Sequence, residues 1–339
     1  MSTLKRFGKR AVVHTVARVA PIAWRWRKPG SLVVLMYHRV LPKESPARQT
    51  EQPGMYVSPE TLDMHLTELK RHFELVHLDD WLRRTKEGKA QPRLACALTF
   101  DDGWRDNYDF ALPVLVKHCA PATIFLVSSY IGATQQFWQN RLIKLVLQEC
   151  ALPGSVPFPA ELRVLIQPLL DMSLRARVSA EEIAPVVWRA LKFEERKIRT
   201  FIEIAEAGQQ QDSEERDMLD QYEITKMAST GLIRFGAHSA THFRLDSNAS
   251  DEILQSEIVH SRAPLQEICG QPIEIFCYPN GITCASAVAL TSRHYLGAVN
   301  TATGWCSSNC NRYQIPRIRL HEDITNDRHA FLARISGWL

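Results

Sequence analysis

The sequence predicts an α/β protein built on a distorted (β/α)7–8 barrel that is interrupted by a helical insertion. Short apolar runs alternate with amphipathic helical stretches, which is the pattern of parallel β/α architecture. Residues 135–223 break this alternation, because they are helical in character throughout. Polar side chains that can bind a metal follow directly on two of the apolar runs, as they do at the carboxyl ends of barrel strands.

The predicted strands are short apolar runs bounded by turn residues. They cover residues 31–42, 73–78, 93–100, 122–127, 232–237, 273–278, 297–301 and 315–320. The first helix of the barrel is expected to begin at Ser58, because Pro59 stands at the favoured first helical position. Further helices are predicted at 79–87, before Cys119, at 251–268, at 286–293 and from about residue 326.

The composition favours a globular enzyme. The chain has 339 residues, 45% of them apolar and 23% charged, which is enough to bury a sizeable core and excludes a disordered or coiled-coil chain. No apolar stretch reaches the ~18–20 residues that a membrane-spanning helix needs. Residues 135–223 are too long for an ordinary connection, so we expect a helical insertion over one end of a catalytic domain that spans 31–339.

Three aromatic residues of the expected insertion could take part in substrate binding. Phe137, Trp138 and Trp188 could line a surface that stacks on a sugar or faces a lipid. Packing in a hydrophobic core is the simpler interpretation for each of them.

Residues 1–30 form a basic N-terminal extension. The first 43 residues contain ten Lys and Arg and no acid, whereas the rest of the chain is mildly acidic, which argues against a nucleic-acid groove. The apolar run 11–24 resembles a secretory signal, but Arg18 interrupts it and no small-residue cleavage site follows. The basic residues do not gather on one helical face. We expect a solvated extension or peripheral contact of residues 1–28 with an anionic membrane.

The eight cysteines are expected to be free thiols in a reducing compartment, because a chain of this length needs no disulfide framework. None forms a CxxC pair. Cys306 and Cys310 could in principle bind a metal, but no second pair of cysteines accompanies them. Together with the missing secretion signal, these features predict a cytoplasmic protein, either free or peripheral at the inner face of the cytoplasmic membrane.

Two carboxylates, Asp101 and Asp102, follow the predicted strand 93–100. Adjacent side chains at a strand end point to opposite sides, so one carboxylate can bind a cation while the other faces a substrate. Two ionised carboxylates this close repel each other, and a cation or a cationic side chain must offset the repulsion. Gly103 allows a sharp turn at this point. The alternative is that the aspartates cap the next helix.

Two imidazoles, His238 and His242, follow the predicted strand 232–237 at a spacing of four. One helical turn or a tight loop would bring both rings to one point. Two histidines and one carboxylate are the ligand set of an open catalytic zinc site. Because the carboxyl ends of barrel strands share one face, Asp102 can complete this set. A histidine pair without a role in metal binding is the alternative.

The segments TFDDG and HSATH resemble two motifs of the polysaccharide deacetylase family, carbohydrate esterase family four, which includes nodulation-type chitooligosaccharide deacetylases. The resemblance covers roughly residues 33–320 outside the insertion. It implies a metal-dependent hydrolase that removes N-acetyl groups from an amino sugar in a glycan or glycan precursor. It also implies that Asp101 is the catalytic base and that Asp102, His238 and His242 bind one divalent metal, usually Zn²⁺.

The third motif of the family is matched by FCYPNG at residues 276–281. The resemblance implies that the main-chain N–H of Tyr278 helps to bind the oxyanion. An ordinary Pro-Asn-Gly turn is the alternative. The family's arginine before this motif, which orients the base, is missing here. Arg317 in IPRIRLH is the candidate substitute, preferred over Arg319 because it directly follows Pro316.

The general acid has two candidates. The segment LMYHRV resembles the rearranged motif order of biofilm poly-N-acetylglucosamine deacetylases, which implies that His38 protonates the leaving amine. His321 in RLHED is the second candidate.

The exact substrate stays open. A nucleotide-linked or polyprenyl-linked amino sugar fits a cytoplasmic protein better than an assembled wall polymer. The same site could hydrolyse another C–N acyl bond, such as a formamide or a cyclic imide. A non-catalytic glycan-binding module is a further alternative, although a binding module has no need of both Asp101 and Asp102.

Overall fold

The computed structural model describes residues 3–173, 178–207 and 216–338. The first residues of the expected basic extension, two short parts of the expected insertion, and the side chains of residues 3–9 lie outside this description. The chain divides into two compact units. The first contains Met1–Pro42, Tyr56–Gly132 and Met218–Leu339, and the second contains Lys43–Met55 and Ala133–Asp217.

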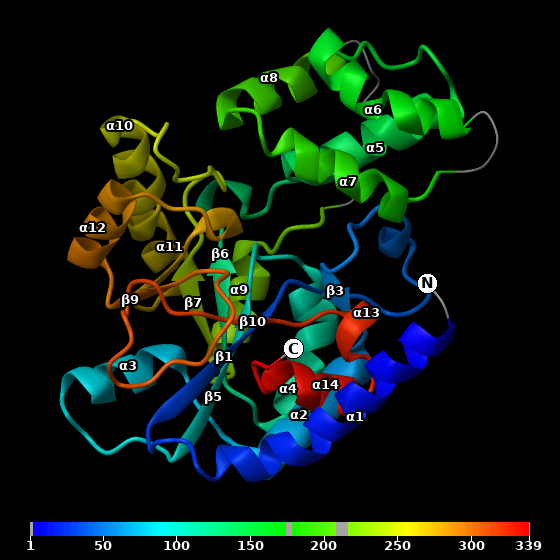
Figure 1. Ribbon diagram of the computed structural model, residues 1–339. Coiled ribbons are helices and arrows are strands. Elements are labelled where there is room, and N and C mark those ends of the chain that lie inside the picture. Colours follow the sequence, from blue (N-terminus) through cyan, green and yellow to red (C-terminus); the bar gives the residue numbers. More distant parts are fainter. Residues whose placement is uncertain (1–2, 174–177, 208–215, 339) are drawn as a thin grey trace. The chain divides into compact units, whose positions relative to one another are not determined.

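A curled parallel sheet surrounded by helices forms the first unit (Figure 1). The strand order is β10-β1-β5-β6-β7-β8-β9, and β4 pairs with the beginning of β5. The strands are β1 Ser31–Tyr37, β4 Glu74–Leu75, β5 Leu94–Phe100, β6 Ala122–Leu126, β7 Ile233–Ala237, β8 Ile275–Cys277, β9 Gly297–Val299 and β10 Ile318–Arg319. A separate two-stranded sheet joins β2 Arg39–Val40 to β3 Tyr56–Val57.

The two edges of the curled sheet are linked through the segment that leads into β10. The main-chain N–H of Ile315 donates to the Ala298 carbonyl at 2.9 Å, and the Asn300 N–H donates to the Ile315 carbonyl at 3.0 Å. Strands β1 and β6 are largely apolar and fully buried, because the sheet is covered on both faces there. The predicted fold class, a distorted β/α barrel, is therefore confirmed.

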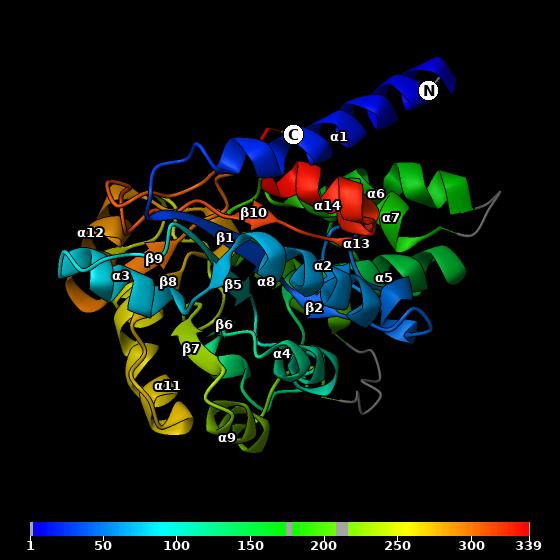
Figure 2. The ribbon, with the colours of Figure 1, turned by 90° about the horizontal axis from the view of Figure 1, so that it is seen from below.

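Helices cover the outside of this sheet. They are α1 Thr3–Trp24, α2 Pro59–His72, α3 Leu78–Lys86, α4 Leu112–His118, α9 Gln221–Ser229, α10 Asp251–Leu254, α11 Arg262–Cys269, α12 Ala285–His294, α13 Glu322–Thr325 and α14 Arg328–Ile335. Helix α2 begins where the sequence predicts, because the Ser58 hydroxyl accepts the Thr61 N–H at 3.1 Å. A π-helical stretch, η4 Gln255–His260, connects α10 to α11. Helix α1 lies along α14 (Figures 1 and 2).

The second unit has its own hydrophobic core. Its helices are α5 Trp138–Ala151, α6 Ala160–Ser173, α7 Ala180–Ala190 and α8 Glu195–Glu206. Phe137 and Trp138 are buried, whereas Trp188 is exposed. Of the three aromatic residues considered as substrate contacts, Trp188 alone presents its side chain to solvent.

The expectation of eight free thiols is wrong at one pair. Cys306 and Cys310 form a disulfide, with their Cα atoms 5.6 Å apart, and the other six cysteines are free. The short Ser-Ser-Asn connection brings the two Cα atoms to a normal disulfide separation. The cysteines therefore do not indicate a reducing compartment. Within the described residues, none of the helices has both the length and the apolar character needed to cross a bilayer.

Candidate metal and active site

The alternation of side chains along the strands places the candidate residues inside the curled sheet. Leu32 and Val34 of β1, Ala95 and Ala97 of β5, and Ile275 of β8 share one inner apolar cluster. Because successive side chains point to opposite faces, the same alternation brings Cys277 at the end of β8, and His38 and Asp101 just past the ends of β1 and β5, to the inner side. Three strands therefore place polar side chains in the interior of the curled sheet.

The structure brings Asp102, His238 and His242 together. The Asp102 Oδ1 lies 3.3 Å from the His238 Nε2 and 3.5 Å from the His242 Nε2. One ligand atom from each residue lies within 4.8 Å of the other two, and all three side chains are buried. Two imidazoles and one carboxylate are the donor set of catalytic zinc sites with an open position. The ligand atoms of Asp102, His238 and His242 are therefore suited to bind one divalent metal ion.

Neighbouring groups orient each of these three side chains. The Trp104 indole N–H donates to the Asp102 Oδ2 at 3.0 Å. The His238 Nδ1 lies 2.7 Å from the Cys277 carbonyl, which can only accept, so Nδ1 carries a proton and Nε2 is the ring atom that faces Asp102. His242 has a left-handed backbone, with φ 59°. Such backbone is uncommon outside glycine, which indicates that the surrounding fold holds this loop.

Glu257 anchors the loop that carries His242. Its carboxylate accepts the Thr241 N–H at 2.8 Å and the Thr241 hydroxyl at 2.7 Å. Glu257 is buried and lies in the π-helical stretch η4. The sequence pattern did not identify Glu257 as a residue that supports the site, because Glu257 lies 16 positions from Thr241.

Arg317 binds the other carboxylate, Asp101, through both oxygens. The Arg317 Nη1 lies 2.6 Å from Oδ1 and Nη2 lies 2.7 Å from Oδ2. Arg317 also donates to the Asn300 carbonyl and to the Thr99 hydroxyl. The guanidinium is buried, so this bidentate pair is shielded from water. The arginine expected to replace the missing family arginine is thus in contact with Asp101.

Both carboxylates are held in the ionised form. Burial alone would raise the pKa of Asp101, but the Arg317 guanidinium outweighs burial and the pKa lies below its usual value. Burial would also raise the pKa of Asp102, but the hydrogen bond with His238 and the nearby imidazoles lower it. Both side chains are therefore charged at neutral pH, as a base and a metal ligand must be.

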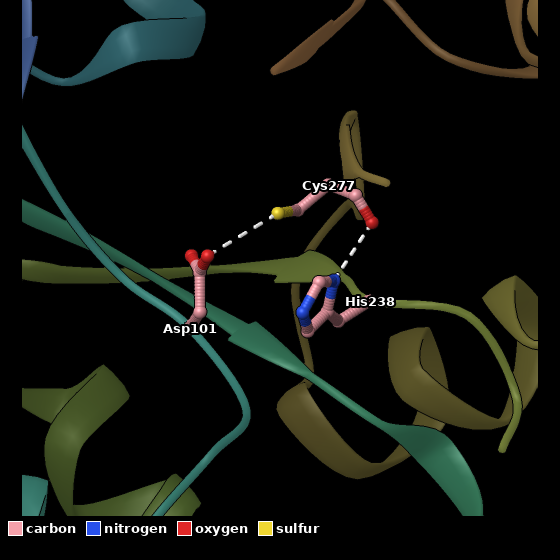
Figure 3. A group of neighbouring side chains, drawn as sticks. All are labelled: Asp101, His238 and Cys277. Carbon is pink, nitrogen blue, oxygen red and sulfur yellow. Dashed lines mark hydrogen bonds between the residues drawn. The ribbon is translucent and has the colours of Figure 1, made fainter. Parts of the chain in front are cut away.

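Cys277 connects the two halves of the site (Figure 3). Its thiol donates to the Asp101 Oδ2 at 3.6 Å, and its carbonyl accepts the His238 N–H. Asp101, His238 and Cys277 form a second group of potential metal ligands. The Arg317 Nη2 lies 3.2 Å from the Cys277 Sγ and covers Asp101. A cation there would meet the guanidinium, so the Asp102 group is the better metal site.

Of the two candidate general acids, His38 is the one whose side chain lies near Asp101. Its Nε2 is 3.9 Å from the Asp101 Oδ2, and burial lowers its pKa although both aspartates act in the opposite direction. The His321 Nδ1 instead lies 3.2 Å from the exposed carboxylate of Asp323.

The expected oxyanion donor, the main-chain N–H of Tyr278, is engaged elsewhere. It donates to the Val299 carbonyl at 3.2 Å, and the Tyr278 side chain packs in the outer apolar cluster. The expectation is wrong because the pairing with β9 extends one residue past the end of β8. Two residues further, Asn280 has a left-handed backbone, φ 55°. Its side-chain Nδ2 is buried without a hydrogen-bond partner in the described part of the chain.

Comparisons with known proteins show which family the chain resembles. The sequence model of the polysaccharide deacetylase family matches residues 88–154 and 179–299. A Bacillus subtilis (strain 168) protein named as a polysaccharide deacetylase is 33% identical over 129 residues, 35% of this chain and 40% of that protein. The poly-beta-1,6-N-acetyl-D-glucosamine N-deacetylase of Staphylococcus epidermidis is 31% identical over 128 residues, 35% of this chain and 44% of that protein.

The matched region spans less than half the length of both curated relatives. Among solved structures, a Streptococcus pyogenes deacetylase in complex with acetate superposes with a TM-score of 0.59 at 16% identity. The match covers 91% of this chain and 99% of that one. At this identity the match shows the fold alone, while the family model covers more than half of the chain. The resemblance noted from the two motifs is confirmed, and the chain belongs to the polysaccharide deacetylase family.

Proposed function

We propose that this protein hydrolyses the N-acetyl group of an amino sugar in a glycan or glycan precursor, with the help of one divalent metal. The observation that carries the proposal is the convergence of Asp102, His238 and His242 beside a second, separately held carboxylate, Asp101. Membership of the polysaccharide deacetylase family supports the reaction class. The name of the Staphylococcus relative supports an N-acetylated glucosamine substrate.

We propose Zn²⁺ as the metal, because two imidazoles and a carboxylate are its usual catalytic ligands. When bound, such a cation polarises the acetyl carbonyl and lowers the pKa of water towards neutrality. The protein prepares the ligands in advance: the Cys277 carbonyl fixes the His238 tautomer, and Trp104 orients Asp102.

Asp101 acts as the general base in this proposal. Arg317 keeps the carboxylate ionised and holds it in one orientation, so it can accept a proton from the attacking water. We propose that His38, whose Nε2 lies 3.9 Å from the Asp101 Oδ2, gives a proton to the departing amine and regains one from solvent, while Asp101 returns to solvent the proton that it took from water. The hydroxyl of water ends on the acetyl carbon as the C–N bond breaks, and the products are acetate and a free amine.

The oxyanion of the tetrahedral intermediate needs a donor other than Tyr278. We propose the Asn280 side-chain amide for this role, because it follows the carboxyl end of β8 and its Nδ2 has no hydrogen-bond partner within the described structure. A preorganised amide donor of this kind contributes ~10²–10³ in kcat.

The experiment is a substrate panel. Metal-stripped protein is incubated with acetylated amino sugars that are free, oligomeric, nucleotide-linked or polyprenyl-linked, with and without Zn²⁺, and acetate is measured. Zinc-dependent acetate release supports the proposal, and the best substrate identifies the carrier. Release of formate or of a ring-opened product would assign another C–N acyl bond. Saturable sugar binding by the metal-loaded protein without any hydrolysis would contradict the proposal and assign a binding module.

A further inference from the structure

The exposed side of α1 carries an apolar stripe. Val13, Val16, Ala17, Ala20 and Trp24 pack against the body of the first unit. In contrast, Val12, Val19 and Ile22 are 51%, 46% and 60% exposed. At about 100° per residue these three lie within roughly 80° of one another on the helix. Trp26, which follows the helix and is 86% exposed, extends the stripe. We call Val12, Val19, Ile22 and Trp26 the apolar stripe.

A basic flank runs beside the apolar stripe. Arg10, Arg18 and Arg25 are all exposed. Helical geometry places Arg10 and Arg18 of α1 about 80° apart on the other side of the exposed surface, and Arg25 directly follows the helix. No acidic residue stands before Glu44. The expectation that the basic residues do not gather on one face also covered Lys5, Arg6 and Lys9, whose side chains lie outside the described residues. The helix has two exposed flanks, one apolar and one basic.

We propose that this outer face of α1 docks on an anionic lipid surface. In this arrangement α1 lies in the plane of the interface, as amphipathic helices with a basic flank do, rather than crossing the bilayer. The apolar stripe enters the boundary between headgroups and acyl chains, and the basic flank contacts the anionic headgroups. Trp26 has an apolar ring with a polar N–H, which suits this boundary.

Charge complementarity favours lipid over a second copy of the chain. Two copies that paired through their apolar stripes would bring two acid-free basic segments together and add like-charge repulsion. An anionic bilayer can instead contact the apolar stripe at its acyl boundary and the basic flank through its headgroups at the same time. The proposal is independent of the proposed deacetylase activity, because it concerns a surface formed by α1 and not the catalytic residues.

The test measures binding of the full chain to sedimenting vesicles of phosphatidylcholine alone or mixed with phosphatidylglycerol. We expect binding to the anionic vesicles at least about tenfold tighter, and this preference to weaken at high salt. Val19→Glu and Ile22→Glu should each reduce binding by about tenfold. The matched control is Val116→Glu on α4, because Val116 has the same side chain and the same 46% exposure as Val19. Thermal unfolding checks that each variant is folded.

Two further variants separate the contributions. Arg18→Gln with Arg25→Gln should remove most of the preference for anionic vesicles, and Trp26→Phe should abolish a blue shift of tryptophan emission on vesicle binding. Equal losses in Val116→Glu and Val19→Glu, or no preference for anionic vesicles, would overturn the proposal. A dimer in light scattering that Val19→Glu dissociates, without vesicle binding, would assign the stripe to a second copy instead.

Discussion

Asp101 and Asp102 are neighbours in the chain but have different surroundings. Both oxygens of Asp101 face the Arg317 guanidinium, whereas Asp102 faces two imidazoles and an indole N–H. Because the guanidinium already neutralises Asp101, a metal gains most from Asp102. Strand-end geometry thus gives two adjacent carboxylates different partners, which is what the proposed roles of Asp101 as base and Asp102 as metal ligand require.

Asp101→Asn should leave the metal site intact and reduce turnover by ~10²–10⁴, because it removes the base and not a ligand. Zinc content after dialysis and acetate release are measured on the same sample. Asp102→Asn is the matched control and should lose zinc as well as activity. Full activity of a folded Asp101→Asn protein would rule out the role of Asp101.

His38→Gln should lower turnover by ~10²–10⁴ if His38 delivers the proton to the amine. His321→Gln is the matched control, and we expect it to retain near-normal turnover because His321 contacts the exposed Asp323. Steady-state rates on one substrate at saturating zinc measure both. A large loss in His321→Gln with none in His38→Gln would exchange the two roles.

At the scale of elements, regular strands made most of the site predictable. Short, largely apolar runs marked β5 and β7, although Arg234 interrupts the second, and the polar residues that follow each run identified Asp101, Asp102, His238 and His242. Parallel strands end on one face, so the convergence of these residues follows from the fold class.

Details that depend on pairing beyond a strand were not predictable. The β8–β9 pairing takes up the Tyr278 N–H, and this follows from the position of Val299 and not from the motif FCYPNG. The thiol of Cys277 contacts Asp101 across 176 positions of sequence, so local patterns carry no sign of it. The disulfide between Cys306 and Cys310 was not predicted from the sequence. Composition indicates whether a chain needs disulfides, but it carries no information on the geometry of a short turn.

The π-helical stretch η4 supplies the anchor of the His242 loop, and it can be tested by Glu257→Gln. Losing the charge on Glu257 weakens the two hydrogen bonds to Thr241, and we expect zinc affinity to fall ~10–100-fold. Competition with a chelating dye measures it. Glu252→Gln, a fully exposed carboxylate on α10, is the matched control. Unchanged zinc affinity in Glu257→Gln would show that the loop needs no such anchor.

For the whole molecule, the stability of the first unit depends on contacts of His65, which lies in α2 and contacts β1, α13 and α14. The Tyr37 hydroxyl lies 3.1 Å from its Nδ1, its Nε2 lies 2.7 Å from the Thr325 carbonyl, and its ring stacks on Phe331. Burial lowers its pKa from 6.5 to about 3, although the bond to Thr325 acts in the opposite direction. The folded protein therefore keeps His65 neutral where the unfolded chain is protonated.

This shift predicts acid sensitivity of the fold. The unfolded chain takes up the proton first as the pH falls below 6.5, so His65 lowers the free energy of unfolding by up to ~1.4 kcal/mol per pH unit between about pH 6.5 and pH 3. Urea unfolding at about pH 7 and pH 5 should show a fall ~2 kcal/mol smaller in His65→Gln than in the wild type. The exposed His260→Gln variant should keep the wild-type pH dependence. Equal pH dependence in all three proteins would show that His65 does not control it.

We propose that Asp102, His238 and His242 hold a metal that the hydrolysis of an N-acetyl amino sugar requires. The decisive measurement is acetate release by metal-stripped protein during titration with Zn²⁺. We predict that activity rises with zinc to saturation at about one equivalent and stays at background in Asp102→Asn. Acetate release that is independent of added metal, or no release from any acetylated amino sugar by the zinc-loaded protein, would overturn the proposed metal-dependent deacetylation.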